Sequence, residues 1–271
     1  MNPLPSPRSW LFAALVGGAL ACTAAAWSAP VASTGGRSET PASTLLEPLD
    51  RSWAAQAPPS HGSTGRDAMQ SLSQGRWASA CATASSVLAR QVPDVEALGV
   101  FALCAALTGD RAAAATAQAR LKEAEPSPYF GPLTHGVLQL LDKQPQKAQV
   151  SWRPLLQARG DDPLVLYFEG EALHARQQPD QAVAAFQRVL KAWPDFTPAL
   201  TALARLSAGP KASAQALQAA LSMAERATQI EPTNRGHWRL LADLCRRTGQ
   251  VGRADAIALQ YLRPPSLPAL R

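Results

Sequence analysis

The sequence predicts an all-α fold: a superhelical stack of about six helix-turn-helix repeats, or α-solenoid. Three observations support this prediction. Two amphipathic segments joined by a short polar turn fill the window 163–194. Small residues recur in the same register every 34 residues or so along the chain. Prolines stand at the ends of several of these units, where a helix cannot continue.

The window 163–194 defines one unit of the pattern. Gly170 lies in its first segment, Ala182 in its second, and Pro194 ends it. Small residues at facing positions let two helices approach to about 8–10 Å. We therefore expect Ala182 to lie against Gly170 within this helix pair.

The same register extends over most of the chain. Units begin at His61, Val95, Tyr129, Pro163, Thr197 and, after a four-residue insertion, Arg235. Position 8 of these units is Ala68, Ala102, Gly136, Gly170, Ala204 and Ala242. Position 20, counted back from the closing proline in the unit with the insertion, is Ala80, Ala114, Ala148, Ala182, Ala220 and Ala254. The first unit departs from the pattern, since Gly62 and Gly65 weaken its first helix. The third departs through Pro154, which falls inside its second helix.

This pattern resembles the tetratricopeptide repeat family, whose signature is W-x-x-L-G-x-x-Y, then A-x-x-x-F, then P. The last unit is similar in its first half, with Trp238, Leu241, Ala242 and, in the tyrosine place, Cys245. The unit at Pro163 is similar in its second half, with Ala182, Phe186 and Pro194. The resemblance covers about three quarters of the chain and implies a protein-binding scaffold with no cofactor or catalytic centre.

The resemblance also implies a concave groove lined by positions 2, 5, 9, 12 and 13 of the first helices. The groove residues expected to contact a partner are Leu103, Phe130, Leu133, Val137, Leu140, Tyr167, Glu171, Arg205, Arg239, Asp243 and Arg246. The groove begins apolar and ends charged. The alternative for the apolar half is that the linker or tight coiling of the stack covers it.

The N-terminus predicts export. An apolar run follows Arg8 and ends near Ala26, as in a secretory signal peptide over residues 1–26. The stretch GALAC around Cys22 resembles a bacterial lipobox, with Ala19 where leucine is usual. Ordinary cleavage, lipidation of Cys22 and an uncleaved anchor stay open as alternatives. Either of the last two would join the protein to the membrane through its N-terminus.

Composition divides the rest of the chain. Residues 27–60 are rich in Ala, Ser, Thr and Pro and predict a disordered linker. The repeat domain is expected over 61–263 and a proline-rich tail over 264–271.

The sequence lacks the motifs of catalysis and metal binding. It contains no H-E-x-x-H, G-x-S-x-G or C-x-x-C, and no glycine-rich phosphate loop. The adjacent Asp161 and Asp162 fit helix capping better than acid–base chemistry. We therefore predict no enzyme activity, no metal and no cofactor.

The cysteines allow one disulfide. Cys81 and Cys104 lie at level positions of neighbouring antiparallel helices, and export would permit a bond between them. The alternative is two small buried apolar side chains.

Charge points to the kind of partner. The net charge is +6, and residues 197–271 carry ten Lys and Arg against four Asp and Glu, so the whole excess lies in the last third. Export and the lack of an aromatic platform argue against nucleic acid. A protein or peptide with apolar and acidic segments fits the groove better.

We thus expect a periplasmic scaffold or assembly factor of the bacterial envelope, soluble or anchored as a lipoprotein. Pilus or secretion assembly and cytochrome c maturation are contexts where similar exported repeat proteins occur. The alternative function is an accessory subunit that presents substrate to an envelope enzyme such as a cell-wall hydrolase.

Overall fold

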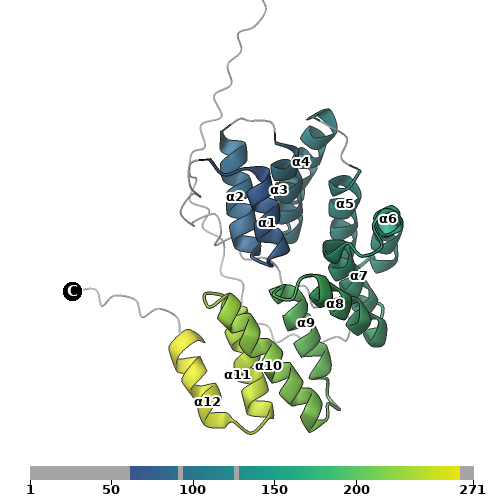
Figure 1. Ribbon diagram of the computed structural model, residues 1–271. Coiled ribbons are helices and arrows are strands. Elements are labelled where there is room, and N and C mark those ends of the chain that lie inside the picture. Colours follow the sequence, from purple (N-terminus) through teal and green to yellow (C-terminus); the bar gives the residue numbers. More distant parts are fainter. Residues whose placement is uncertain (1–61, 91–93, 125–127, 263–271) are drawn as a thin grey trace, which may run out of the picture. The chain divides into compact units, whose positions relative to one another are not determined.

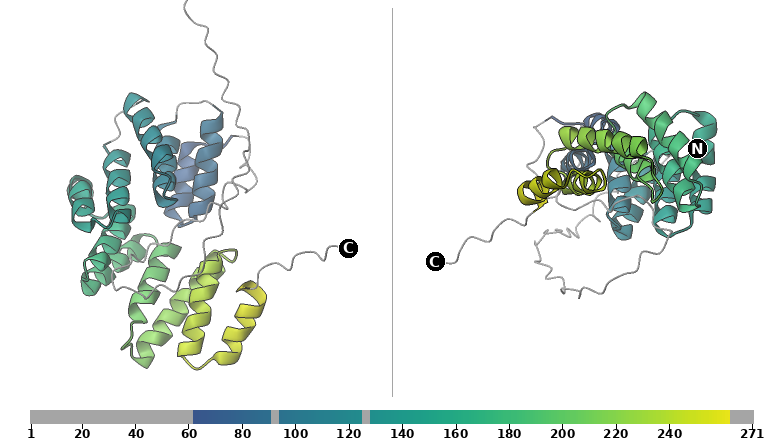
Figure 2. Two further views of the ribbon diagram at one scale, coloured as in Figure 1. Left: turned by 180° about the vertical axis from the view of Figure 1, so that it is seen from behind. Right: turned by 90° about the horizontal axis from the view of Figure 1, so that it is seen from below.

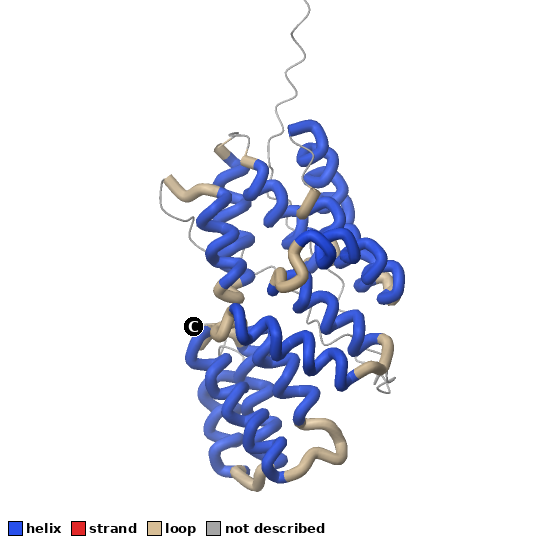
Figure 3. The backbone as a smooth tube through the Cα atoms, turned by 45° about the vertical axis from the view of Figure 1, so that its right-hand side comes forward, coloured by secondary structure: helices blue, strands red, loops and turns tan. Residues whose placement is uncertain are grey.

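A computed structural model describes residues 62–90, 94–124 and 128–262, and within these ranges it contains helices and turns but no strand (Figure 3). The prediction of an all-α repeat fold is confirmed. The predicted signal peptide, linker and C-terminal tail, together with Cys22, lie outside the described residues.

The twelve α-helices of the described residues form six antiparallel hairpins that follow one another in chain order (Figures 1 and 2). The hairpins are α1 (Gly65–Ser73) with α2 (Trp77–Ala89), α3 (Val95–Leu107) with α4 (Arg111–Ala124), α5 (Phe130–Leu141) with α6 (Pro145–Ala158), α7 (Pro163–Ala175) with α8 (Pro179–Ala192), α9 (Thr197–Ser207) with α10 (Ala214–Ile230), and α11 (Arg235–Arg247) with α12 (Val251–Ile257). A π-helical turn, Ala258–Leu262, follows α12. Each second helix also packs on the first helix of the next hairpin.

Five of the six hairpins reverse direction at the same place, position 15 of the unit. The residues there have positive φ: Gly75 (74°), Gly109 (73°), Lys143 (59°), Gln177 (60°) and Gly249 (81°). At each turn the N–H of the following residue donates to the carbonyl five residues back, as Arg76 does to Ser71 at 3.0 Å. This is the Schellman closure of a helix end, which requires the left-handed conformation and favours glycine. The 34-residue spacing therefore repeats a backbone conformation as well as a side-chain pattern.

The fifth hairpin turns differently because of its insertion. Its helices are separated by residues 208–213, and Ser213 begins α10 as an N-cap whose side chain accepts from the Ala216 N–H at 3.1 Å. The result is the longest helix among the described residues, with 17 residues.

Two of the helix crossings depend on glycine, and in each of them the glycine lies against a large aromatic ring. A Cβ at Gly170 would lie 2.7 Å from Phe186 Cε1, and a Cβ at Gly136 would overlap the indole of Trp152. In these two hairpins position 8 thus receives the large aromatic residue of position 24. The expected contact between Ala182 and Gly170 stays a prediction. An aromatic ring reaches across the crossing where two small residues alone would leave a void.

Two helices that the sequence made doubtful are present. Thr64 forms a capping box with Asp67 at the start of α1, and the Gly65 N–H donates to Asp94 Oδ2 at 2.8 Å. Helix α6 continues through Pro154, whose side chain is exposed. Asp162 caps α7 by accepting from the Leu164 and Val165 N–H groups at 3.1 Å, as predicted for this pair of aspartates.

Cys81 of α2 and Cys104 of α3 form a disulfide in the structure. The Sγ atoms are 2.01 Å apart and the Cα atoms 5.8 Å apart, and neither residue is exposed to solvent. Cys245 is a free, buried cysteine, and burial raises the pKa of its thiol. A protonated buried thiol is a poor nucleophile.

The helices between Gly62 and Leu262 are each too short or too polar to cross a lipid bilayer.

Gly136 gives a test of the helix crossing. Replacing it with alanine should lower the unfolding free energy by about 1–3 kcal/mol, because the added methyl displaces Trp152, whose Nε1 donates to the Leu133 carbonyl at 3.1 Å. The matched control is Gly131→Ala in the same helix, where an added Cβ meets nothing within 4 Å. That change should be neutral or stabilising by up to about 1 kcal/mol. Chemical denaturation of both variants measures the difference, and equal midpoints would contradict this packing.

The disulfide predicts a labelling pattern. In unfolded protein that has not been reduced, Cys245 should react with a thiol reagent, while Cys81 and Cys104 should not. Reduction should expose both and lower the unfolding free energy by about 2–4 kcal/mol. Mass spectrometry of labelled peptides checks the first point. Labelling of Cys81 or Cys104 before reduction would show that these residues are only buried apolar side chains.

Candidate partner-binding surface

The groove positions predicted on α3, α5 and α7 are buried in this structure. Leu103, Leu133, Val137, Leu140 and Glu171 have no exposed surface, and Tyr167 and Phe130 retain 4% and 5%. Except for Glu171, all of them belong to the large hydrophobic cluster that runs from Ala68 to Leu203. In this structure these side chains are part of the core, so none of them forms a surface open to a partner.

The first hairpin contributes an aromatic residue to the same region. Trp77, the first residue of α2, has its ring centroid 6.2 Å from Tyr167 and 6.0 Å from Phe168, both on α7. It also lies 6.0 Å from Phe196, the residue before α9. Tyr167 and Phe196 are themselves 5.3 Å apart. We call Tyr167, Phe168 and Phe196 the aromatic pocket, because together they hold one indole at distances typical of aromatic pairs.

The sequence prediction missed Trp77. It occupies position 17 of its unit, where other units have Arg111, Pro145, Pro179 and Val251. The sequence signal that could have found Trp77 is an aromatic residue at a position that holds arginine, proline or valine in these other units. The periodicity alone could not find its partners, because they lie about 90 to 120 residues further along the chain.

The charged end of the predicted groove is accessible. Arg239, Asp243 and Arg246 are exposed on α11, and Arg205 on α9 is half-buried. The three residues of α11 are spaced four and three apart, which places them on one face of the helix. We call them the α11 charged face.

Several arginines of the last third have structural partners. Arg247 donates to the carbonyls of Ala208 and Gly209, and so closes the C-terminal end of α9. Arg253 pairs with Glu225 at 2.7 Å, and Arg246 lies 3.8 Å from Asp255. Within the described residues, no ion pair or hydrogen bond engages Arg239. The positive charge is therefore partly used in holding the last hairpins together.

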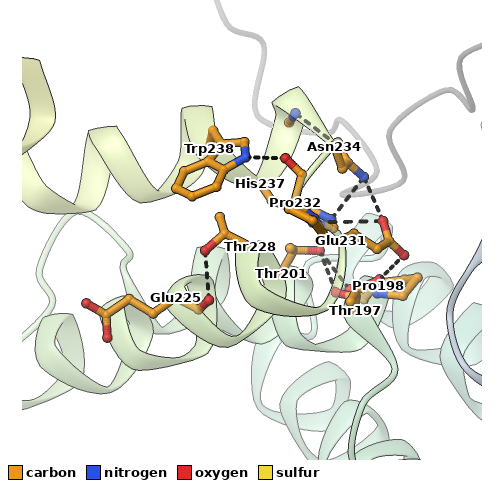
Figure 4. Close-up of polar contacts among 11 residues, drawn as sticks. Thr197, Pro198, Thr201, Glu225, Thr228, Glu231, Pro232, Asn234, His237 and Trp238 are labelled. Carbon is orange, nitrogen blue, oxygen red and sulfur yellow. Dashed lines mark hydrogen bonds and ion pairs between the residues drawn. The ribbon is translucent and has the colours of Figure 1, made fainter. Parts of the chain in front are cut away.

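A polar network joins the last two units at the start of their first helices (Figure 4). The Glu231 carboxylate accepts from Thr197 Oγ1 at 2.8 Å and from Asn234 Nδ2 at 3.0 Å. His237 Nδ1 lies 3.9 Å from the same carboxylate, and only 6% of His237 is exposed. Asn234 also caps α11 through the Gly236 N–H at 3.0 Å. The network links α9 to α11, and its geometry suits that structural role.

The described residues provide no cluster of side chains suited to hold a metal ion. Within them no three His, Cys, Asp or Glu side chains gather as metal ligands would. His135, His174 and His237 lie on three different helices, and His61 is outside the described residues. Burial lowers the pKa of His174 and raises that of Glu169, but Glu169 already accepts from Gln149 Nε2 at 2.6 Å.

Comparisons with known proteins add little to this picture. No protein-family model and no curated protein matches the chain. Among solved structures, MamA residues 41 to the end from Desulfovibrio magneticus RS-1 is similar, with 16% identity, 73% of this chain and 91% of that chain covered, and a TM-score of 0.29. A MamA RS-1 ArsTM double mutant is similar at 16% identity, with 73% and 90% covered and the same TM-score of 0.29. At these values we draw no conclusion about function from the likeness.

Proposed function

We propose that this protein is a non-enzymatic scaffold or assembly factor that binds a protein partner in the bacterial cell envelope. The observation that carries the proposal is the α11 charged face. Arg239, Asp243 and Arg246 occupy groove positions 5, 9 and 12 and are exposed, whereas the equivalent positions of α5 hold the buried Leu133, Val137 and Leu140. An exposed row of charges at groove positions is suited to guiding a partner.

The chemistry of the partner follows from this face. The face carries two arginines and one aspartate, Arg246 lies beside Asp255 of α12, and the whole +6 of the chain lies in residues 197–271. A protein or peptide segment rich in acidic side chains complements it. Any apolar segment of the partner would have to bind elsewhere or displace parts of the chain, because the apolar groove positions are buried.

The envelope setting rests on the N-terminal sequence and is supported by the cysteines. The run that ends near Ala26 has the composition of a signal peptide. A bonded Cys81–Cys104 pair suits an oxidising compartment such as the bacterial periplasm. Lipidation at Cys22 would hold the scaffold at the membrane surface, and ordinary cleavage would release it.

The α11 charged face gives a binding test with a matched control. Affinity purification from an envelope extract supplies the partner, and surface-binding kinetics across salt concentrations then measure its association. Arg239→Glu with Arg246→Glu should slow association about tenfold or more at low salt and flatten its salt dependence, because charge steers encounter and salt screens it. Arg120→Glu with Arg153→Glu makes the same change of charge at exposed positions of α4 and α6. That control should bind like the natural protein.

Equal association rates for both double variants would contradict binding through the α11 charged face. Leu133 is no substitute as a probe, because it is fully buried and its carbonyl accepts the Trp152 hydrogen bond. An aspartate there would test the fold instead of the binding surface.

A further inference from the structure

The Gly75–Trp77 turn of the first hairpin lies against α7 and the start of α9. A Cβ placed on Gly75 would come within 2.8 Å of the Thr197 backbone N and 3.1 Å of Pro198 Cδ. Two residues later, Trp77 fills the aromatic pocket. The turn is thus fitted to these helices through both its backbone and its side chain.

The hairpin does not need this tryptophan for its own geometry. The α3–α4 hairpin has the same turn, with Gly109 at φ 73° against 74° for Gly75, and Arg111 in the place of Trp77. Nothing lies within 4 Å of a Cβ placed on Gly109. Trp77 is therefore explained by the pocket that it fills and not by the turn that carries it.

The contact has the features of a separable one. Phe168 and Phe196 are fully buried and Tyr167 is 4% exposed, whereas Trp77 is only half-buried. No described residue accepts a hydrogen bond from the Trp77 indole, so apolar contacts with the aromatic pocket and the adjoining core hold this side chain in the described structure. A buried indole usually secures a partner for its N–H. Replacing Trp77 by another aromatic ring would leave no described hydrogen bond broken.

We propose that the aromatic pocket is a binding site for an aromatic side chain of a partner, and that Trp77 occupies it in the unbound protein as an intramolecular competitor. This inference rests on the proposed scaffold function and names a second contact for it. The partner segment would carry an exposed tryptophan, which the pocket accepts through the tilted and edge-on contacts that it now makes with Trp77. Displacement would free the Gly75–Trp77 turn from α9.

The test uses N-acetyl-L-tryptophanamide as the probe and N-acetyl-L-leucinamide as its aliphatic control. Trp77→Ala empties the pocket, so calorimetry should show saturable binding of the tryptophan probe at one site, at least tenfold tighter than to the natural protein. The leucine probe should show no comparable gain, because it lacks a ring. A Trp77→Ala protein with natural helical circular dichroism and no saturable binding would overturn the proposal.

If Trp77→Ala loses its helical circular dichroism, a second pair of variants, Gly75→Ala and Gly109→Ala, tests the proposal. Both place alanine at nearly the same positive φ, so their intrinsic strain is matched, but only the first collides with Thr197. Gly75→Ala should bind the tryptophan probe several-fold tighter than Gly109→Ala. Equal affinities would overturn the proposal. The tryptophan probe is a small molecule, so equal affinities would not change the outcome of the kinetic test on the α11 charged face.

Discussion

The left-handed residue at position 15 is the constraint on which the repeat architecture depends. In five of the six hairpins it lets the first helix close with its own hydrogen bonds and reverse within about three residues, so the second helix returns antiparallel. Lys143 and Gln177 adopt this conformation without the freedom of glycine, which shows that packing of the flanking helices enforces it. Once the reversal is fixed, position 8 always faces the second helix, and a glycine there can receive Trp152 or Phe186.

The Trp77 contact changes how such an array holds together. In a simple solenoid each repeat touches only its neighbours, and stability is a sum of local terms. Here the first hairpin also touches the fourth unit through Tyr167, Phe168 and Phe196, and Gly75 lies close to Thr197 at the start of the fifth. Loosening of α2 would therefore also disturb the packing of α7 and of the start of α9. The disulfide from α2 to α3 acts on the same hairpin, because Cys81 lies one helical turn after Trp77.

Sequence reasoning predicted the local features and missed the distant ones. The hairpins, the six-unit register and the Asp162 cap follow from periodicity and local hydrogen-bonding rules, and the structure has all of them. The contact between Gly170 and Phe186 was not predicted, because small residues were expected to lie against one another. A glycine also makes room for an aromatic ring. The burial of Leu133 and Val137 was one of two alternatives that the sequence left open, since a register places a side chain on a face but does not say what covers that face.

The arginines of residues 197–271 also differ in their surroundings, which their positions in the sequence do not reveal. A count of charges makes residues 197–271 a basic patch, yet Arg247 and Arg253 bind groups of neighbouring helices. These two side chains are charged, and their contacts fix their positions. They therefore add to the positive electrostatic potential around α11 but do not rearrange to contact a partner. Arg239 differs from them, because its side chain is exposed and no described residue pairs with it. A steering contact needs an exposed charge of this kind, which is why the proposed function places the partner contact on the α11 charged face.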